Sequence, residues 1–250
     1  MVPLLLLVIV VMTCTDHPVI MWSGFAAVLL LQIGIVVYGC INIQSGYFVQ
    51  ALCKGKTEEK IVALTFDDGP NATYSGSILD TLKQYNVPAA FFVIGRNIEG
   101  NEAILKRMDA EGHILGNHSF SHHFWFDMYS TKKMIADLHQ ADAEIKKATG
   151  KLVRLFRPPY GVTNPNVKSA IKRTGYIPVG WSVRSMDTAA KDKAHLLAKI
   201  NNQLEPGAII LLHDSMEITA AVLPELIESI QAKGYRITGL DELLNIRAYA

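Results

Sequence analysis

The sequence has almost no charge in its first fifth. Residues 1–53 carry one charged side chain, Asp16, although the 250-residue chain has 24 Lys and Arg and 23 Asp and Glu. The formal net charge is +1, so the composition shows neither a basic surface of the kind that binds nucleic acid nor an acidic excess. We therefore expect an apolar leader followed by an ordinary polar domain, and no nucleic-acid partner.

Cysteine is also scarce, and its positions are informative. Cys14, Cys40 and Cys53 all lie in the leader or at its edge. The polar domain therefore lacks the thiols needed for a disulfide framework or a cysteine-based zinc site. The sequence also has no internal repeat, no low-complexity tract and no glycine fingerprint for a nucleotide. These absences exclude a disulfide-stabilised domain, a thiolate zinc site and a dinucleotide-binding unit of the Rossmann type.

The leader contains two apolar runs. Residues 2–12 would cover only about half of a hydrocarbon core near 30 Å, at about 1.5 Å per residue. Residues 18–43 are long enough to span a membrane with some tilt. Aromatic residues suited to a membrane interface lie near the ends of this second run: Trp22, Tyr38 and Tyr47. We expect residues 1–43 to form a lipid-contacting anchor, with one span at about 18–43 or a hairpin that includes 2–12. A cleaved signal peptide is the alternative.

Short apolar runs alternate with amphipathic stretches after a predicted linker at residues 44–60. The predicted strands are 61–66, 87–95, 113–118, 153–159, 176–183, 207–214 and 235–240. The predicted helices are 75–86, 99–111, 131–149, 164–174, 191–204 and 220–233. Apolar strands separated by helices indicate an α/β domain with parallel strands over residues 61–250. About seven strands favour a (β/α) barrel, complete or incomplete, over an open sheet.

Polar side chains gather where five of these predicted strands end. They are Asp67 and Asp68, His118 and His122, Arg157 and Tyr160, Asp187, and His213 and Asp214. The carboxyl ends of the strands form the face of a β/α barrel on which sites are built. Agreement among five strand ends therefore predicts one shared site.

Two motifs suggest a metal. In HSFSH at 118–122, histidines four residues apart on a helical turn could reach one ion, although surface or capping histidines give the same pattern more often. In TFDDGP at 65–70, neighbouring carboxylates on extended chain point to opposite sides, so one could bind the metal and the other act as a base. Two histidines and one carboxylate leave coordination positions open, as in a catalytic site. We expect the neighbouring His123 to be solvated.

Four motifs in order resemble those of the polysaccharide deacetylases, a family of metal-dependent carbohydrate esterases that act on glycans such as chitin and peptidoglycan. They are TFDDGP at 65–70, HSFSH at 118–122, RPPYG at 157–161 and ILLHD at 210–214. The resemblance covers about residues 58–245. It implies a distorted (β/α) barrel and a divalent metal, usually zinc, with Co²⁺, Mn²⁺ or Ni²⁺ as alternatives.

The resemblance also implies roles for individual residues. The implied metal ligands are Asp68, His118 and His122. The implied catalytic residues are Asp67 as general base, Arg157 as its bidentate partner, His213 as general acid, Asp187 as the hydrogen-bond partner of His213, and Tyr160 as a backbone donor to the oxyanion. Residues expected to line the substrate pocket are Leu211, Pro159 and Trp181. Such a set suits amide hydrolysis, which needs a polarised carbonyl, an activated water and a protonated leaving amine.

One stretch departs from the family pattern. After the strand the family usually has Asp-x-x-Asp-Trp, whereas this chain has Arg184, Asp187 and Thr188 at the three defined positions. The loss of the aromatic residue puts substrate preference in doubt more than reaction type. Arg184 could meet an anionic group of the substrate, or it could be a solvated surface arginine.

The expected function is removal of N-acetyl groups from a cell-envelope glycan, at N-acetylglucosamine or N-acetylmuramic units of peptidoglycan or a chitin-like polymer. This substrate places the domain outside the cell membrane, whereas Lys54, Lys56 and Lys60 after the anchor favour the cytoplasmic side. A cytoplasm-facing deacylase or deformylase of a lipid-linked amino sugar is one alternative. A catalytically inactive, membrane-tethered glycan-binding module is an alternative of another class.

Overall fold

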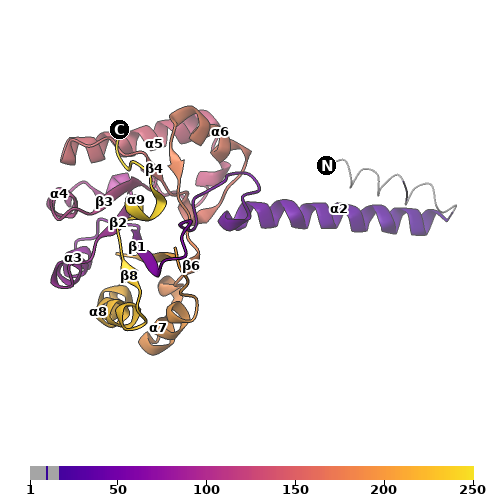
Figure 1. Cartoon of the computed structure of the whole chain (residues 1–250). Helices are drawn as coiled ribbons and strands as arrows, with labels where there is room; N and C mark the ends of the chain where they lie inside the picture. The colour runs from indigo at the N-terminus through magenta and orange to yellow at the C-terminus, as the bar shows by residue number, and fades with distance from the viewer. Residues whose placement is uncertain (1–9, 11–16) are drawn as a thin grey trace.

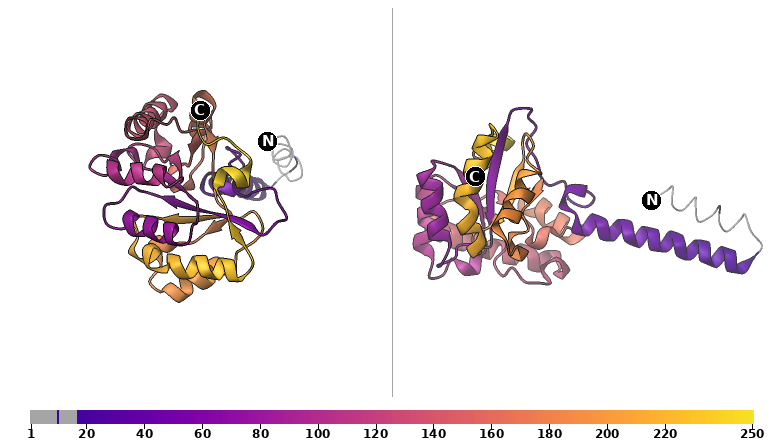
Figure 2. Two further views of the ribbon diagram at one scale, coloured as in Figure 1. Left: turned by 60° about the vertical axis from the view of Figure 1, so that its left-hand side comes forward. Right: turned by 90° about the horizontal axis from the view of Figure 1, so that it is seen from below.

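The computed structural model describes residue 10 and residues 17–250, so the first apolar run at 2–12 lies outside the described residues except for Val10. The first described helix, α2, is Pro18–Ile41 and projects away from the rest of the chain (Figures 1 and 2). Its 24 residues are about 36 Å long at about 1.5 Å per residue, which exceeds a hydrocarbon core of about 30 Å. Among the described residues it is the one helix long and apolar enough to cross a membrane.

The rest of the chain is an α/β domain built on one parallel sheet. The strands are β1 Ile61–Asp67, β2 Ala89–Val93, β3 Ile114–Asn117, β4 Leu155–Phe156, β5 Ile177–Pro178, β6 Val183–Arg184, β7 Ile209–His213 and β8 Arg236–Ile237. The helices are α3 Ser75–Gln84, α4 Glu102–Ala110, α5 Thr131–Thr149, α6 Pro165–Thr174, α7 Lys193–Asn201, α8 Glu217–Ala232 and α9 Leu240–Leu244. The strand order is β5-β4-β3-β2-β1-β7-β6, with β8 beside β1, and every pair is parallel. The predicted α/β class and incomplete barrel are confirmed.

The stretch predicted as one strand at 176–183 is two strands, and this part of the prediction is wrong. β5 pairs with β4 and β6 pairs with β7, so the two pieces lie at opposite ends of the strand order. Between them, Gly180 donates its N–H to Leu52 O at 3.0 Å, and a Cβ at Gly180 would lie 2.5 Å from the Cys53 sulfur. The chain leaves the sheet between β5 and β6 because the segment around Leu52 and Cys53 lies beside Val179 and Gly180.

That neighbouring segment belongs to the predicted linker at 44–60. Leu52 forms a parallel bridge with Val179, and Lys54 forms an antiparallel bridge with Ala208. Ile43, just before the segment, and Val49 within it are buried. Residues 43–54 therefore lie along the opening of the barrel and connect α2 to its wall.

The alternation along β1 decides which side chains enter the barrel. Val62, Leu64 and Phe66 pack in the core between the sheet and its helices, whereas Ala63 packs in the barrel interior. Successive strand residues point to opposite faces, so Thr65 and Asp67 share the interior face with Ala63. The strand thus delivers a carboxylate to the barrel mouth while its apolar half stabilises the fold.

Candidate active site

The neighbouring strands β1 and β7 bring Asp67 and His213 to the same edge of the sheet. β1 and β7 are in register, with Asp67 opposite His213. Along β7, Leu211 packs in the barrel interior and Leu212 in the core on the helix side, so His213 points to the interior and Asp214 away from it. Asp214 is buried and accepts a hydrogen bond from Ser75 Oγ on α3. Burial raises its pKa to about 7, and it has no place in the pocket described below.

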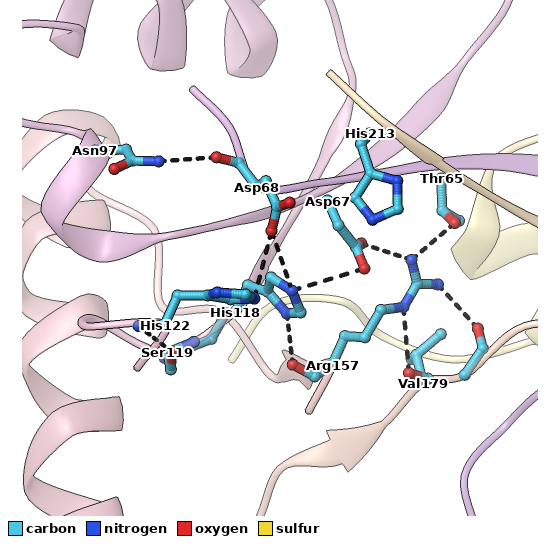
Figure 3. A network of polar contacts seen from close by, with 12 residues as sticks. Thr65, Asp67, Asp68, Asn97, His118, Ser119, His122, Arg157, Val179 and His213 are labelled. Carbon is cyan, nitrogen blue, oxygen red and sulfur yellow. Dashed lines mark hydrogen bonds and ion pairs between the residues drawn. The ribbon is translucent and has the colours of Figure 1, made fainter. Parts of the chain in front are cut away.

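Three side chains converge as a possible metal site (Figure 3). Asp68 Oδ1 lies 3.6 Å from His118 Nε2 and 3.4 Å from His122 Nε2. One ligand atom from each of the three residues can be chosen so that all lie within 4.8 Å of one another. Two nitrogens and one carboxylate oxygen on a tetrahedral zinc would be about 3.3 Å apart, given metal–ligand distances of about 2.0–2.2 Å. The spacing of these donors therefore fits a small divalent cation.

The protonation of His118 suits a ligand. Its Nδ1 donates to the carbonyl oxygen of Arg157 at 2.7 Å, which leaves the lone pair of Nε2 directed toward Asp68. Burial, with the repulsion that a proton on His122 would add, lowers the pKa of His118 to about 3, and burial also lowers the pKa of His122. Both rings are therefore neutral near pH 7, as metal coordination requires.

The two histidines do not lie on a helical turn, so the expected route to this geometry is wrong. Residues 118–122 form a loop after β3 in which Ser119 and His122 have φ of 67° and 41°. Asn117 Oδ1 accepts from Ser119 N at 2.7 Å, and Ser119 Oγ accepts from His122 N at 3.0 Å. These side-chain bonds hold a sparsely populated backbone conformation, and such strain is concentrated at functional sites.

The two carboxylates face the same pocket rather than opposite sides. Asp68 has φ of 77°, which ends the alternation of β1 immediately after Asp67. As a result His118 Nε2 lies 3.7 Å from Asp67 Oδ2 as well as 3.6 Å from Asp68 Oδ1. Asn97 Nδ2 donates to Asp68 O at 2.8 Å and holds this turn. The expectation of opposite directions assumed an extended chain, which the left-handed residue interrupts.

A hydrogen bond from the Arg157 guanidinium fixes the position of the Asp67 carboxylate. The guanidinium is fully buried and donates from Nη1 to Asp67 Oδ1 at 2.7 Å and to Thr65 Oγ1 at 2.9 Å. Its other donors reach the carbonyls of Val179 and Gly180, so the contact with Asp67 is one hydrogen bond and not the expected bidentate pair. Burial raises the pKa of Asp67, and the charge of Arg157 acts in the opposite direction.

Hydrogen bonds to Asp187 hold His213 in the same way. Asp187 Oδ1 lies 2.7 Å from His213 Nδ1, and Asp187 Oδ2 accepts from His213 N at 2.7 Å and from Thr219 Oγ1 at 2.6 Å. Burial opposes charge on His213, but the hydrogen bond and charge of Asp187, with the charges of Asp67 and Asp68, raise its pKa to about 9. The imidazole is therefore protonated near pH 7, with Nε2 free to face a substrate.

A comparison with known proteins assigns the chain to a family. The model of the polysaccharide deacetylase family matches residues 54–179. A Bacillus subtilis relative, peptidoglycan-N-acetylmuramic acid deacetylase PdaA, is 37% identical over 194 residues, covering 76% of this chain and 73% of the relative. The chain belongs to the polysaccharide deacetylase family. The solved structure of PdaA, described as a family 4 carbohydrate esterase, has a TM-score of 0.73 at 35% identity, covering 80% of this chain and 88% of that one.

Two further structures show the range of this deacetylase family. A chitin deacetylase from Colletotrichum lindemuthianum has a TM-score of 0.74 at 29% identity, covering 80% of this chain and 95% of that one. A family pseudoenzyme from Bacillus anthracis, BA3943, has a TM-score of 0.71 at 28% identity, covering 76% and 67%. The pseudoenzyme shows that the fold alone does not guarantee catalysis, so the argument for activity depends on the side chains of the site.

The deacetylase site opens into a pocket of about 250 Å³. Of the residues expected to contact substrate, Leu211 and Trp181 line it, whereas Pro159 is buried and does not. Tyr160 lines the rim with φ of 58°, and within the described part of the chain its backbone N–H donates to no protein acceptor. That N–H is available for a ligand. The rim also includes Arg184 and Thr188, the two residues that depart from the family pattern.

Several residues that support this deacetylase site were not predicted from the sequence. Thr65 holds Arg157, Asn97 holds the turn at Asp68, and Ser185 and Thr219 hydrogen-bond Asp187. Only Thr65 could have been found, because it lies two residues before Asp67 on the same face of β1. The others come from turns and from α8, whose approach to the site depends on the packed fold.

Asp187→Asn is expected to move the alkaline limb of the pH profile. His213 can act as an acid only while protonated, and this form is lost as pH rises through its pKa of about 9. Without the Asp187 charge, burial dominates and the pKa of His213 falls. The alkaline limb of kcat should then move down by about two pH units. Glu205→Gln, at an exposed carboxylate paired with Lys54, should leave the profile unchanged. An unmoved limb in Asp187→Asn would assign the acid to another group.

Proposed function

We propose that the chain is a metal-dependent hydrolase that removes N-acetyl groups from N-acetylhexosamine units of a cell-envelope glycan, either peptidoglycan or a chitin-like polymer. One observation carries the proposal. A single pocket brings together the Asp68, His118 and His122 donors, the Asp67 carboxylate held by Arg157, and the His213 ring held by Asp187. The names of the relatives, a peptidoglycan deacetylase and a chitin deacetylase, support the substrate class.

The donor set favours zinc, with Co²⁺, Mn²⁺ or Ni²⁺ as alternatives, because neutral imidazole and carboxylate suit all four. Asp68, His118 and His122 would hold the ion. When bound, such a cation supplies Lewis acidity, which polarises an amide carbonyl and makes water more acidic. The remaining steps depend on groups of the chain itself.

Asp67 is the proposed general base. Arg157 fixes one of its oxygens, Oδ1, while Oδ2 faces the pocket near His118. Burial raises its pKa, which makes the carboxylate a better proton acceptor than a solvated aspartate. The Tyr160 N–H is the proposed donor to the oxyanion that develops on the acetyl oxygen. Leu211 offers an apolar wall for the acetyl methyl group.

His213 is the proposed general acid. An amine is a poor leaving group unless it is protonated, so the C–N bond breaks as a proton moves from His213 Nε2 to the sugar nitrogen. Asp67 would take a proton from the water whose oxygen bonds to the carbonyl carbon, and this new C–O bond replaces the C–N bond that breaks. That proton balances the one given by His213, and acetate and the free amino sugar leave. Asp187 keeps the ring charged and oriented for this transfer. With every one of these groups in place, an inactive binding module is the weaker reading.

We also propose that α2 anchors the enzyme in the cell membrane, with residues 1–43 as anchor, 44–60 as connection and 61–250 as catalytic domain. The length and apolar composition of α2 support a span, and an envelope substrate supports an extracytoplasmic domain. Lipid around α2 and the glycan are the proposed partners.

A substrate panel tests this function. The chain with one equivalent of zinc should release acetate from N-acetylglucosamine oligomers or peptidoglycan fragments, measured by an enzyme-coupled acetate assay. Muramic-type units belong in the panel because Arg184 places a cation on the pocket rim. Lipid-linked amino sugars, assayed for acetate and formate, represent the alternative substrate. Release only from the lipid-linked sugars, or from none of the panel, would contradict the proposal.

A further inference from the structure

The end of α2 is fixed to the loop that follows β4. Thr163 donates its N–H to Cys40 O at 2.9 Å and its Oγ1 hydroxyl to Gly39 O at 3.3 Å. Gly39 packs so closely on Tyr47 that a Cβ there would lie 2.6 Å from its ring. Ile43, two residues after α2, is buried. Because no free spacer separates helix and domain, a membrane that α2 crosses would lie directly against this side of the domain.

A second loop lies beside this junction. Asn164, next to Thr163, donates from Nδ2 to Asp127 O at 2.6 Å, and Asn166 Nδ2 donates to Tyr129 O at 3.2 Å. These bonds tie the loop at 124–129 to the segment that holds the end of α2. The ring of Phe124 also lies 6.0 Å from that of Tyr160 on the pocket rim. The second loop therefore connects the helix exit with the mouth of the pocket.

Exposed apolar side chains concentrate at this place. In the described chain after α2, the large exposed apolar residues are Tyr47, Phe124, Trp125, Met128, Leu152, Tyr160 and Met186. All except Leu152 and Met186 belong to the segments that meet at the helix exit. Phe124, Trp125 and Met128 are 65%, 59% and 69% exposed. Single exposed apolar residues are ordinary, but a cluster of this kind marks an interaction surface.

Two lysines complement the apolar side chains. Lys168 and Lys172 are four residues apart on α6 and line a groove of about 450 Å³ with Tyr47 and Phe48. The groove begins five residues after the end of α2. Aromatic residues beside lysines at the end of an apolar helix are typical of a membrane interface, where rings enter the headgroup region and ammonium groups meet lipid phosphates.

We propose that Tyr47, Phe124, Trp125, Met128 and Tyr160, here termed the exit surface, rest on the anionic lipid surface of the membrane that α2 crosses. The proposal depends on the proposed anchor, since α2 brings the bilayer to this side. It places the mouth of the catalytic pocket at the lipid surface. The enzyme would then act on glycan immediately next to the membrane and would not reach distant layers of the polymer.

Quenching of Trp125 fluorescence tests the contact. The full chain is placed in nanodiscs of phosphatidylcholine and phosphatidylglycerol, with plain or brominated acyl chains. The chain has three tryptophans, so Trp22→Phe removes the one in α2, and subtracting the Trp22→Phe/Trp125→Phe spectrum isolates Trp125. We expect brominated lipid to reduce the Trp125 emission about two-fold, as for a ring in the interfacial region.

A relocated reporter provides the control. Leu152 is 46% exposed and lies outside the exit surface, so Leu152→Trp in the Trp22→Phe/Trp125→Phe chain should emit equally in both discs. Equal quenching at both positions, or none at Trp125, overturns the proposal. So does Trp125 emission that responds to soluble glycan oligomers but not to brominated lipid. Acetate release from soluble oligomers, measured on the same chains, tests the proposed function separately, because it requires no lipid contact.

Discussion

Asp67→Asn is expected to abolish turnover while the protein keeps its metal. The amide has nearly the shape of the carboxylate, and its oxygen can still accept the hydrogen bond from Arg157 Nη1. It cannot accept a proton from water at any useful pH. General base catalysis contributes about 10²–10⁴-fold, so kcat should fall by that factor. Zinc content after dialysis, measured by atomic emission, should stay at one equivalent because Asp68, His118 and His122 are unchanged.

Stability provides a second readout for the same variant. Arg157 is fully buried, and Asp67 is the one carboxylate with which it forms an ion pair in the described chain. Removing one partner of a buried ion pair costs about 3–5 kcal/mol, so the melting temperature should fall. Asp80→Asn is a suitable control, since Asp80 pairs with Arg107 at a surface site where its side chain is 73% exposed. Normal turnover in folded, zinc-loaded Asp67→Asn would show that the base is another group.

The sequence was sufficient for the parts of this site that depend on local periodicity. Alternation along β1 and β7 puts Asp67 and His213 on the interior face, and their parallel pairing brings them to one edge. Both the alternation and the parallel pairing can be predicted from the sequence. The family resemblance of the motifs implied which residues would meet, and the trio of Asp68, His118 and His122 does meet.

What the sequence could not provide is the backbone path between the motifs. The left-handed φ of Asp68 is held by a contact from a distant segment, the hydrogen bond from Asn97 Nδ2 to Asp68 O. The break between β5 and β6 likewise depends on residues 52–54, far away in the sequence. Non-glycine residues rarely adopt such conformations, so local propensity argues against them. They persist because the packed barrel satisfies them.

His118→Ala is expected to remove both metal and activity, in contrast to Asp67→Asn. The ring supplies Nε2 to the donor trio, and its Nδ1 bond to Arg157 O aligns that nitrogen. Only Asp68 and His122 remain as donors, and the Arg157 carbonyl loses its hydrogen-bond partner. Loss of a group that only orients a ligand costs about 10–100-fold in affinity, so loss of the ligand itself should cost at least about 100-fold. Dialysed protein should contain little zinc, and acetate release should fall to background.

His123→Ala is the matched control for this ligand. His123 is adjacent to His122 but exposed, and its Nδ1 accepts from Trp125 N at 3.0 Å, so it is outside the donor trio. Its replacement should leave zinc content and acetate release within about two-fold of the parent, as for most surface substitutions. Adding excess zinc to His118→Ala distinguishes weakened binding from a lost site, because it restores zinc occupancy only where binding is merely weakened. If His118→Ala kept one tight equivalent through dialysis, the ion would have to sit elsewhere. Asp67 and His213 would then have no metal beside them, and the proposal of metal-dependent hydrolysis in this pocket would fail.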